Sequence, residues 1–321
     1  MSFKTFLDLV EIKTKVAALF PFIIGILFAL FRFGEINILN TIVFFASMFI
    51  FDMTTTAINN FMDYFKATDK HNYDYRKTKN IIGQAQIPES LVRNVILLML
   101  TAAAGLGLYL VTLTNIVVLF TGIVCFAVGI FYTFGPIPLS RMPLGELFSG
   151  VTMGLGITFL AVYINNPYII IFEHLNGIVN ISINIKELGI IFLIAIPSVL
   201  TIACLMLANN ICDLREDILN NRFTLPYYIG KSPAIVLFEL MYYVAYISII
   251  IAIFLGVHSI FMPVALATFF PVFKNLLIFR KEQEKSSTFV IAVKNLILVN
   301  GGVVSGLVIY FLWNRTLILL L

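Results

Sequence analysis

The sequence predicts an all-α, polytopic membrane protein of about nine transmembrane helices, and three observations lead to this class. Hydrophobic residues make up 60% of the 321 residues, charged residues only 12%, and the mean hydropathy is +0.99. A soluble domain carries about 25% charged residues. Since about 20 apolar residues cross the hydrocarbon core of a bilayer, the chain has material for nine spans and little for a soluble domain. We expect a single transmembrane domain over residues 1–321.

Nine apolar runs with polar segments between them give the helices in order. They cover residues 16–33, 38–62, 91–112, 115–134, 144–164, 188–210, 233–255, 258–279 and 288–312. No small-residue cleavage site follows the first run, so we expect a retained helix rather than a signal peptide. In the fifth helix, Gly154-Leu155-Gly156 predicts close packing against another helix.

The basic residues are distributed unevenly between the two ends of these helices. If the N-terminus is cytoplasmic, 18 of the 21 Lys and Arg residues lie on that side, and only Arg32, Lys186 and Arg315 lie on the other. Cytoplasmic loops carry such an excess, so we expect a multi-pass protein of the cytoplasmic membrane with a cytoplasmic N-terminus. Nothing suggests a nucleic-acid partner, and the three cysteines show neither disulfide nor zinc spacing.

A short pattern occurs twice. Asn-Asn-x-x-Asp at residues 59–63 recurs at residues 209–213, which is 150 residues later. Both copies fall at the cytoplasmic end of a long apolar run, in the second and sixth helices. A chance match of so short a pattern is the alternative, but the equivalent placement favours two related halves of four helices each, followed by a ninth helix.

Polar residues extend from each copy along one helical face. Spacings of three, four and seven residues place side chains on the same face of a helix. An unpartnered charge inside a membrane costs at least ~2.5–3.5 kcal/mol, which makes a function the favoured explanation. The first face holds Asp52, Thr56, Asn59, Asn60 and Asp63, and the second holds Asn209, Asn210, Asp213 and Asp217, with Glu216 beside it.

These residue types suit a magnesium diphosphate. Carboxylate and amide oxygens are hard ligands, and Mg²⁺ prefers one or two carboxylates together with phosphate oxygens. Without His or Cys ligands nearby, zinc and copper are disfavoured. The basic residues interleaved with the acids would neutralise the remaining phosphate charge; they are Lys66, Lys70, Arg141, Arg215, Arg222 and Lys231.

The alternative interpretation is that these are ordinary loop charges, helix caps and positive-inside residues. We favour a functional role for Asp63, Asp213 and Asp217, while for Asp52 a site residue and a buried helix contact are equally favoured. The ordinary interpretation is favoured for Arg76, Lys77, Lys79, Arg280, Lys281, Glu282, Glu284 and Lys285.

The two copies resemble the aspartate-rich motifs of the UbiA superfamily of intramembrane aromatic prenyltransferases, and within it most closely the MenA branch of 1,4-dihydroxy-2-naphthoate polyprenyltransferases. The first motif, Asn-Asp-x-x-Asp followed by a Lys and a further Asp, corresponds to Asn59-Asn60-Phe61-Met62-Asp63-Tyr64-Phe65-Lys66-Ala67-Thr68-Asp69. The second corresponds to residues 209–217, with the downstream tail Arg222-Phe223-Thr224-Leu225. Tyr132-Thr133-Phe134-Gly135 and Glu146 match further family elements, so the resemblance covers most of the chain.

Three positions depart from the family pattern. Asn60 stands where the family has its first Asp, and Ala67 stands where other branches have a further Asp, which leaves Asp69 as the nearest replacement. Cys212 stands where related sequences often carry Arg, which leaves Arg215 or Arg222 as the replacement phosphate contact.

The resemblance implies a Mg²⁺-dependent enzyme that transfers a polyprenyl group from polyprenyl diphosphate to 1,4-dihydroxy-2-naphthoate, with loss of the acceptor carboxylate, to give demethylmenaquinone. The implied Mg²⁺ ligands are Asp63, Asp69, Asp213 and Asp217. The implied diphosphate contacts are Asn59, Asn60, Lys70, Asn209, Asn210 and Arg215. Catalysis is assigned to Asp63, Asp213, Lys66, Arg222 and Tyr132, with the prenyl tail between helices, open to the lipid bilayer, and the active site opening to the cytoplasmic side.

Other functions stay open at this point. One is prenyl transfer to another aromatic acceptor, such as 4-hydroxybenzoate, haem or a chlorin. Another is secondary transport, with the intramembrane acids as an ion site. Against transport, the polar clusters lie at one membrane edge rather than at the midplane, and the repeats are parallel. An inert scaffold explains neither copy of the motif.

Overall fold

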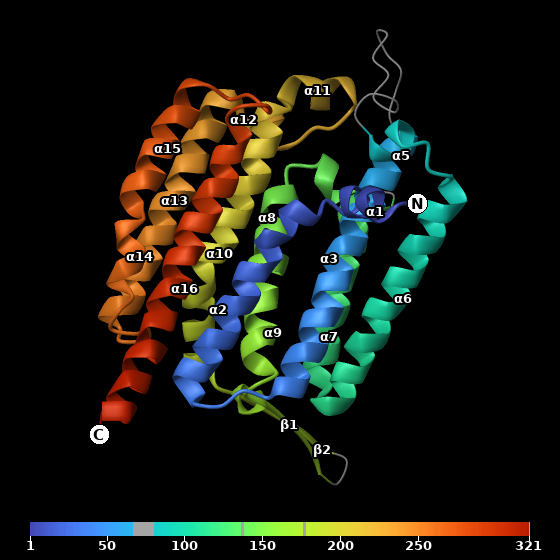
Figure 1. The fold of residues 1–321 in the computed structure, drawn as a ribbon. Helices are drawn as coiled ribbons and strands as arrows, with labels where there is room; N and C mark the ends of the chain where they lie inside the picture. Colours follow the sequence, from blue (N-terminus) through green and yellow to red (C-terminus); the bar gives the residue numbers. More distant parts are fainter. Residues whose placement is uncertain (67–79, 136–137, 176–177, 321) are drawn as a thin grey trace.

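The computed structural model describes residues 1–66, 80–135, 138–175 and 178–320, which form a bundle of long helices (Figure 1). Nine helical segments within these ranges are long and apolar enough to cross a membrane. They are Ile12–Phe33, Ile38–Phe65, Glu89–Leu113, Ile116–Thr133, Gly145–Tyr163, Ile185–Cys212, Lys231–Phe254, Pro263–Lys281 and Phe289–Asn314. The predicted fold class is confirmed, and no predicted helix end differs from these bounds by more than about five residues, within the usual boundary error.

Shorter elements connect these spans. In chain order the elements are α1 (Phe3–Leu9), η1 (Ile12–Lys15), α2 (Val16–Phe33), α3 (Ile38–Lys66), α5 (Ile81–Gln84), α6 (Glu89–Leu113), α7 (Ile116–Thr133), η3 (Leu139–Arg141), α8 (Gly145–Ser149), the π-helical η4 (Gly150–Gly156), α9 (Ile157–Tyr163), η5 (Pro167–Ile169), β1 (Ile170–Leu175), β2 (Ile178–Ile183), α10 (Ile185–Cys212), α11 (Leu214–Leu219), α12 (Leu225–Ile229), α13 (Lys231–Phe254), α14 (Pro263–Ala267), α15 (Phe269–Lys281) and α16 (Phe289–Leu320).

Local signals explain where several helices begin and end. Asn115 caps α7 because its side chain accepts a hydrogen bond from the Val117 amide, and Asn184 caps α10 in the same way. α2 ends at Gly34, whose φ of 81° is a left-handed conformation that glycine adopts without strain.

The helix α10 is the most buried of the spans and packs against α8, η4, α13 and α16. Its contact with η4 depends on glycine, since a Cβ on Gly154 would lie 2.5 Å from the Val199 Cα. The predicted close packing at Gly154 is therefore confirmed. Because α10 contributes to hydrophobic clusters on both sides of the bundle, it fixes where its own C-terminal end, with the second motif copy, lies.

A two-stranded antiparallel hairpin, absent from the sequence prediction, connects α9 to α10. β1 and β2 pair Phe172 with Ile181 on one face and Glu173 with Asn180 on the other. Alternation of apolar and polar residues is the signal of such strands. The two strands are only 6 residues long each, and alternation is confined to the last four residues of β2, so a search for helix-length apolar runs does not detect them.

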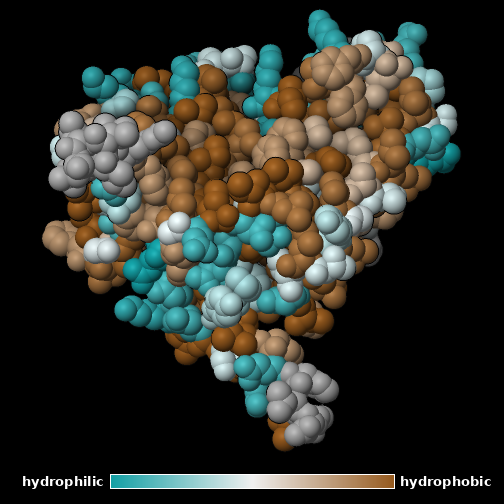
Figure 2. Space-filling model, turned by 60° about the horizontal axis from the view of Figure 1, so that its bottom comes forward, coloured by the Kyte–Doolittle hydropathy of each residue, from teal (hydrophilic) through white to brown (hydrophobic). Residues whose placement is uncertain are grey.

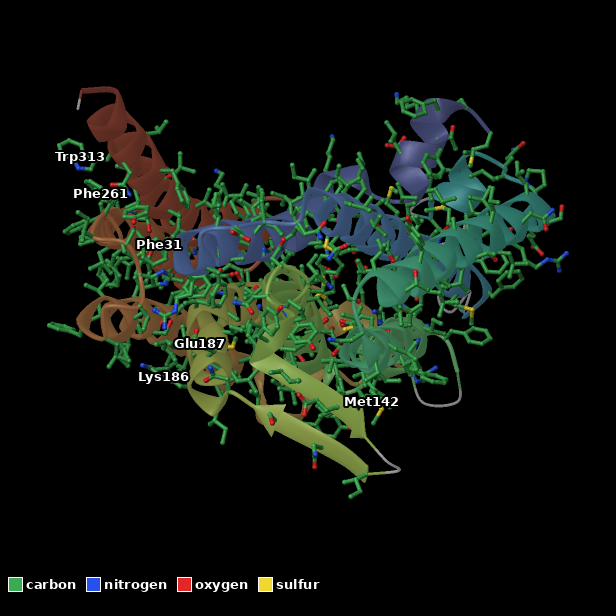
Figure 3. All side chains as sticks on the ribbon, turned by 90° about the horizontal axis from the view of Figure 1, so that it is seen from below. Phe31, Met142, Lys186, Glu187, Phe261 and Trp313 are labelled. Atoms are coloured by element: carbon green, nitrogen blue, oxygen red, sulfur yellow. The ribbon has the colours of Figure 1, made fainter. Side chains whose placement is uncertain are left out.

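The two ends of the bundle differ in character. The N-terminus, α1, α5, α11 and α12 lie at one end, together with the C-terminal ends of α3 and α10, whereas the hairpin and the C-terminus lie at the other (Figure 1). At the hairpin end, Arg32 of α2 pairs with Glu187 of α10 at 2.6 Å, and Figure 3 places Glu187 beside the hairpin. Much of the surface between the ends is apolar (Figure 2). The chain is a multi-pass membrane protein in which both motif copies reach the same end.

Candidate active site

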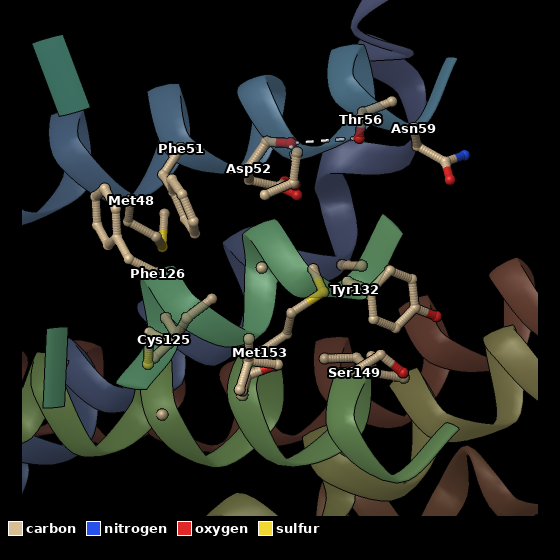
Figure 4. A pocket seen from close by; sticks show the side chains of 18 of the residues that line it. Met48, Phe51, Asp52, Thr56, Asn59, Cys125, Phe126, Tyr132, Ser149 and Met153 are labelled. Carbon is tan, nitrogen blue, oxygen red and sulfur yellow. Dashed lines mark hydrogen bonds between the residues drawn. The ribbon is translucent and has the colours of Figure 1, made fainter. Parts of the chain in front are cut away.

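A cavity of about 760 Å³ runs between α3, α6, α7 and the α8–η4 segment. Met48, Phe51 and Phe126 line one end of the close view, and Asn59 and Tyr132 line the other (Figure 4). The polar end includes the aspartates of both motif copies, and the apolar end continues between α6 and α7. A cavity that is charged at one end and apolar along the rest suits an amphiphilic ligand.

The asparagines of the first copy, at the end of α3, point in different directions. Asn59 lines the cavity, and its Oδ1 accepts a hydrogen bond from Thr133 Oγ1 at 3.1 Å. Asn60 donates through Nδ2 to the Leu9 carbonyl at 2.9 Å and to Glu11 Oε1 at 3.3 Å. The first asparagine therefore faces the cavity, and the second holds the N-terminal segment.

The aspartate of the first copy meets two arginines from later segments. Asp63 Oδ1 lies 3.5 Å from Arg141 Nη2, and Asp63 Oδ2 lies 3.6 Å from Arg222 Nη1. Arg222 also reaches Asp217, with 3.6 Å between Nε and Oδ1. Arg222 thus links the first copy to α11, the short helix that follows the second copy.

The second copy, at the end of α10, repeats this arrangement with different partners. Lys285 Nζ donates to both Asn209 Oδ1 and Asp213 Oδ2, the latter at 2.6 Å. Asn210 donates through Nδ2 to Glu146 Oε1 at 2.8 Å, and both of these side chains are buried. Again the first asparagine and the aspartate face the cavity, while the second asparagine contacts a neighbouring element.

Helix geometry explains the shared arrangement. Residues four apart lie on one face of an α-helix, whereas adjacent residues point about 100° apart. The first asparagine and the aspartate of each copy are four apart, so both face the cavity. The second asparagine turns toward a neighbouring element, and of the two only Asn60 still borders the cavity.

The position of the arginine pair is set by backbone contacts. Arg141 Nη1 donates to the Asn220 carbonyl at 3.2 Å, and the Phe223 amide donates to the Arg141 carbonyl at 3.0 Å. Burial raises the pKa of the Asp217 carboxyl to about 6, and burial together with the neighbouring Arg222 charge lowers the pKa of the Arg141 guanidinium. The polar end of the cavity therefore lies beside a crowded, partly desolvated cluster of charges whose cations are held by the loops.

Asp52 lies deeper in α3 and fits both interpretations that the sequence left open. Lys15 is buried, and its Nζ donates to the Asp52 carbonyl at 3.0 Å, to Asp52 Oδ1 at 3.3 Å and to Thr56 Oγ1 at 2.5 Å. Asp52 is therefore an ion-paired contact between η1 and α3, and it also lines the cavity.

The oxygen donors at the polar end fit Mg²⁺. Asp63 and Asp213 line the cavity with Asn59, and Asp217 has one buried oxygen, Oδ2, without a hydrogen-bond partner. Among the described residues, no group of three His, Cys, Asp or Glu side chains gathers as a metal site on its own. Mg²⁺ needs only one or two carboxylates when phosphate oxygens complete its coordination, so the donor set suits a metal that binds together with a phosphate ligand.

Most of the described residues predicted for the site are found there. The cavity is lined by Asn59, Asn60, Asp63, Tyr132, Asn209, Asp213 and Arg222. Three described candidates do not line it: Arg215 is exposed on α11, whereas Asn210 and Asp217 are buried beside it. Asp69 and Lys70 lie outside the described residues, as does the side chain of Lys66.

Sequence reasoning missed two lysines of the cavity. The sequence favours an ordinary loop charge for Lys285, and in the structure its Nζ contacts Asn209 and Asp213 of the second copy. Arg280 is also more than a loop charge, since it pairs with buried Glu239. Lys15 and Lys285 lie 37 and 72 residues from the aspartates they contact, so only their position on the predicted cytoplasmic side was a signal.

The chain is similar to known proteins over most of its length. The model of the UbiA prenyltransferase family matches residues 18–316. A 1,4-dihydroxy-2-naphthoate octaprenyltransferase of Bacillus subtilis (strain 168) is 27% identical over 250 residues, which cover 77% of this chain and 72% of that protein.

Solved structures share the fold at low identity. A UbiA homologue from Archaeoglobus fulgidus bound to GPP and Mg²⁺ is 12% identical, with a TM-score of 0.62 over 95% of this chain and 99% of that one. The apo structure of a UbiA homologue from Aeropyrum pernix K1 is 14% identical, with a TM-score of 0.65 over 90% of this chain and 97% of that one. A digeranylgeranylglyceryl phosphate synthase is 17% identical, with a TM-score of 0.63 over 96% and 97%.

The family match extends over nearly the whole chain, and the matched region includes both motif copies and the cavity between them. The chain belongs to the UbiA prenyltransferase family and is a membrane-embedded prenyltransferase.

Proposed function

We propose that this prenyltransferase moves a polyprenyl group from polyprenyl diphosphate to 1,4-dihydroxy-2-naphthoate, with Mg²⁺ as its cofactor. The observation that carries the proposal is the meeting of two Asn-Asn-x-x-Asp copies, 150 residues apart in sequence, at the polar end of one otherwise apolar cavity. A diphosphate head and a hydrocarbon tail match the two parts of that cavity.

The diphosphate is expected between Asp63 and Asp213. Arg141 and Arg222 stand beside the first aspartate. Lys66, the last residue of α3, and Lys70, which follows it, are proposed to contribute as well. Fixed cations stabilise a leaving group because they already stand where negative charge develops. When bound, Mg²⁺ would supply further positive charge to the phosphate oxygens, held by Asp63, Asp69, Asp213 and Asp217.

The prenyl tail is expected along the apolar part of the cavity. Side chains from α3, α6, α7 and α9 form this part, among them Phe44, Leu110, Val118 and Leu160. The exclusion of water by these side chains protects a reactive allylic group from hydrolysis.

Transfer breaks the C1–O bond of the donor and the bond to the carboxylate of the acceptor, and it forms one C–C bond. The C1–O bond of the donor breaks, and its electron pair leaves with the diphosphate. Tyr132 lines the cavity at the same end as Asn59 (Figure 4). The face of an aromatic ring attracts a cation, so Tyr132 is proposed to stabilise the allylic charge. The ring carbon that bears the carboxylate forms the new C–C bond. The bond from this carbon to the carboxylate then breaks, CO₂ leaves, and the electron pair of the broken bond restores the aromatic ring.

The choice of acceptor is supported by the likeness to the naphthoate octaprenyltransferase of Bacillus subtilis, which is 27% identical. The asymmetry of basic residues supports an active site that opens to the cytoplasmic side of the cell membrane. Transport is disfavoured, because both copies of the motif lie at one end of the bundle rather than at its middle (Figure 1).

A transfer assay tests the proposal. The purified protein is incubated with labelled prenyl diphosphate, Mg²⁺ and a panel of aromatic acids, with and without a chelator. The expected result is a lipid-soluble labelled product that needs both dihydroxynaphthoate and Mg²⁺. A product with only 4-hydroxybenzoate or a porphyrin would change the acceptor, and no product with any acceptor would reject the proposed activity.

A further inference from the structure

The loop between α15 and α16, residues 282–288, is fixed by local hydrogen bonds at both ends. Gln283 Nε2 donates to two carbonyls in the last turn of α15, at 2.6 and 2.9 Å. The Glu284 amide donates to Thr288 Oγ1 at 2.7 Å, the Thr288 amide donates back to the Glu284 carbonyl at 2.9 Å, and Thr288 is buried. These bonds hold the loop backbone in place, with Lys285 between them.

Lys285 is the charged residue of this loop that lines the cavity. Its Nζ contacts Asn209 and Asp213, and it lies 4.7 Å from the ring centroid of Phe289, which also lines the cavity. The Lys285 side chain is 47% exposed and that of Asp213 is 21% exposed. An ion pair this accessible contributes little to stability, so folding does not account for the position of the lysine.

Cations from three separate segments therefore meet at the polar end of the cavity. Arg141 belongs to η3, Arg222 follows α11, and Lys285 comes from the α15–α16 loop. The two arginines contact Asp63, whereas Lys285 contacts Asp213. One cation beside the second copy and two beside the first place positive charge on both sides of the space where a polyanion would bind.

We propose that Lys285 binds the diphosphate of the prenyl donor and completes the cationic side of that site next to the second copy. A lysine ammonium has three donors on a flexible four-carbon stem, so the group that contacts Asp213 reaches a neighbouring phosphate oxygen by side-chain rotation alone. The Phe289 ring limits the directions that the stem takes. This inference rests on the proposed function, because it assumes that the donor carries a diphosphate.

The test compares three variants with the wild-type protein. Lys285→Met removes the charge and keeps an unbranched stem, Lys285→Arg keeps the charge, and Lys281→Met removes an exposed charge at the end of α15 that does not line the cavity. Binding of inorganic diphosphate in the presence of Mg²⁺ is measured by calorimetry on the purified proteins. The KM values for donor and acceptor and the kcat are measured in the transfer assay.

A lost charge-assisted hydrogen bond to a phosphate oxygen weakens binding roughly tenfold. We expect Lys285→Met to raise the Kd for inorganic diphosphate and the KM for the donor by about that factor, with an unchanged KM for the acceptor. Lys285→Arg is expected to restore most of the binding, and Lys281→Met to bind as the wild type does.

The results that overturn the inference differ from those that overturn the proposed function. Equal diphosphate binding by Lys285→Met and the wild type, or equal weakening in Lys281→Met, would reject the role of Lys285 and leave the function standing. Wild-type transfer to a different acceptor would change the function without affecting the comparison of the variants. Absence of diphosphate binding by the wild type would reject both.

Discussion

The two copies of Asn-Asn-x-x-Asp have the same form and are held differently. Asp63 is 13% exposed and contacts two arginines at 3.5 and 3.6 Å, whereas Asp213 is 21% exposed and contacts one lysine at 2.6 Å. The second asparagine of the first copy, Asn60, holds the N-terminal segment, and its counterpart Asn210 holds buried Glu146. The orientation of the motif on its helix is shared, while its neighbours are not.

This difference separates two kinds of groups: the amide and carboxylate that the motif itself provides, and the cations that the loops around each copy provide. Each copy presents an amide and a carboxylate to the cavity and turns its second asparagine to an adjacent element. The cations come from different loops, since Arg141 follows the fourth span, Arg222 follows the sixth and Lys285 follows the eighth. We infer that the first copy, with its backbone-anchored arginine pair, is the more rigid side of the site, and that the second, with its flexible lysine, is the adjustable side.

Removal of Mg²⁺ is expected to have the largest effect, because both copies depend on it to hold the diphosphate. A chelator should lower prenyl transfer to the level of the control without enzyme, and excess Mg²⁺ should restore it. The released labelled product is measured before and after each addition. Full activity in the chelator would mean that the protein cations alone support the reaction.

Loss of the arginine that links the two copies is expected to come next. Arg222→Gln removes contacts to both Asp63 and Asp217, and loss of one preorganised group that stabilises developing charge lowers kcat by about 100-fold. The matched control is Arg141→Gln, which loses contact with Asp63 alone among the acids. The kcat of both variants is measured by steady-state kinetics. A larger loss of kcat in Arg141→Gln than in Arg222→Gln would reverse the ranking.

The anchoring asparagines are expected to affect stability, and to do so unequally. Asn210→Ala leaves the buried Glu146 carboxylate without its donor, which costs about 1–3 kcal/mol. Asn60→Ala should cost less, because its charged partner Glu11 is exposed and its other partner, the Leu9 carbonyl, is neutral. Thermal unfolding of both variants in detergent compares the two effects. A larger loss in Asn60→Ala would contradict the anchoring contacts described for Asn210.

The smallest effect is expected for Arg215→Gln. Its side chain is exposed on α11 and does not line the cavity, although the sequence made it a candidate for binding diphosphate. The change in kcat/KM should stay within about twofold, as for surface substitutions in general. A loss as large as that of Arg222→Gln would support the sequence-based assignment instead.

Much of the fold follows from the sequence because membrane spans have a strong one-dimensional signal. Long apolar runs bounded by polar segments place all nine spans, since each must satisfy its backbone hydrogen bonds within a helix. The hairpin of β1 and β2 and the short helix α1 carry no comparable signal. The π-helical segment η4 packs closely against α10 at Gly154, which is a tertiary contact.

The site was predictable to the extent that it is local. Asn59, Asp63, Asn209 and Asp213 follow from helical spacing and the repeat, and the structure brings them to one cavity. Lys285 did not follow, because nothing in its own loop distinguishes it from Lys281; only the packing of α16 beside α10 places it against Asp213. The positions of cations that come from distant loops cannot be predicted from a single sequence.

The central claim is that both copies act together on one donor diphosphate. Its most direct test is the rate of prenyl transfer by Asp63→Asn, Asp213→Asn and the double variant, at saturating donor, acceptor and Mg²⁺. We expect a loss of at least about 100-fold in each single variant, and no further multiplicative loss in the double variant, because residues that act as a unit are not additive. Transfer at the wild-type rate by either single variant, in a protein that folds normally, would contradict the claim.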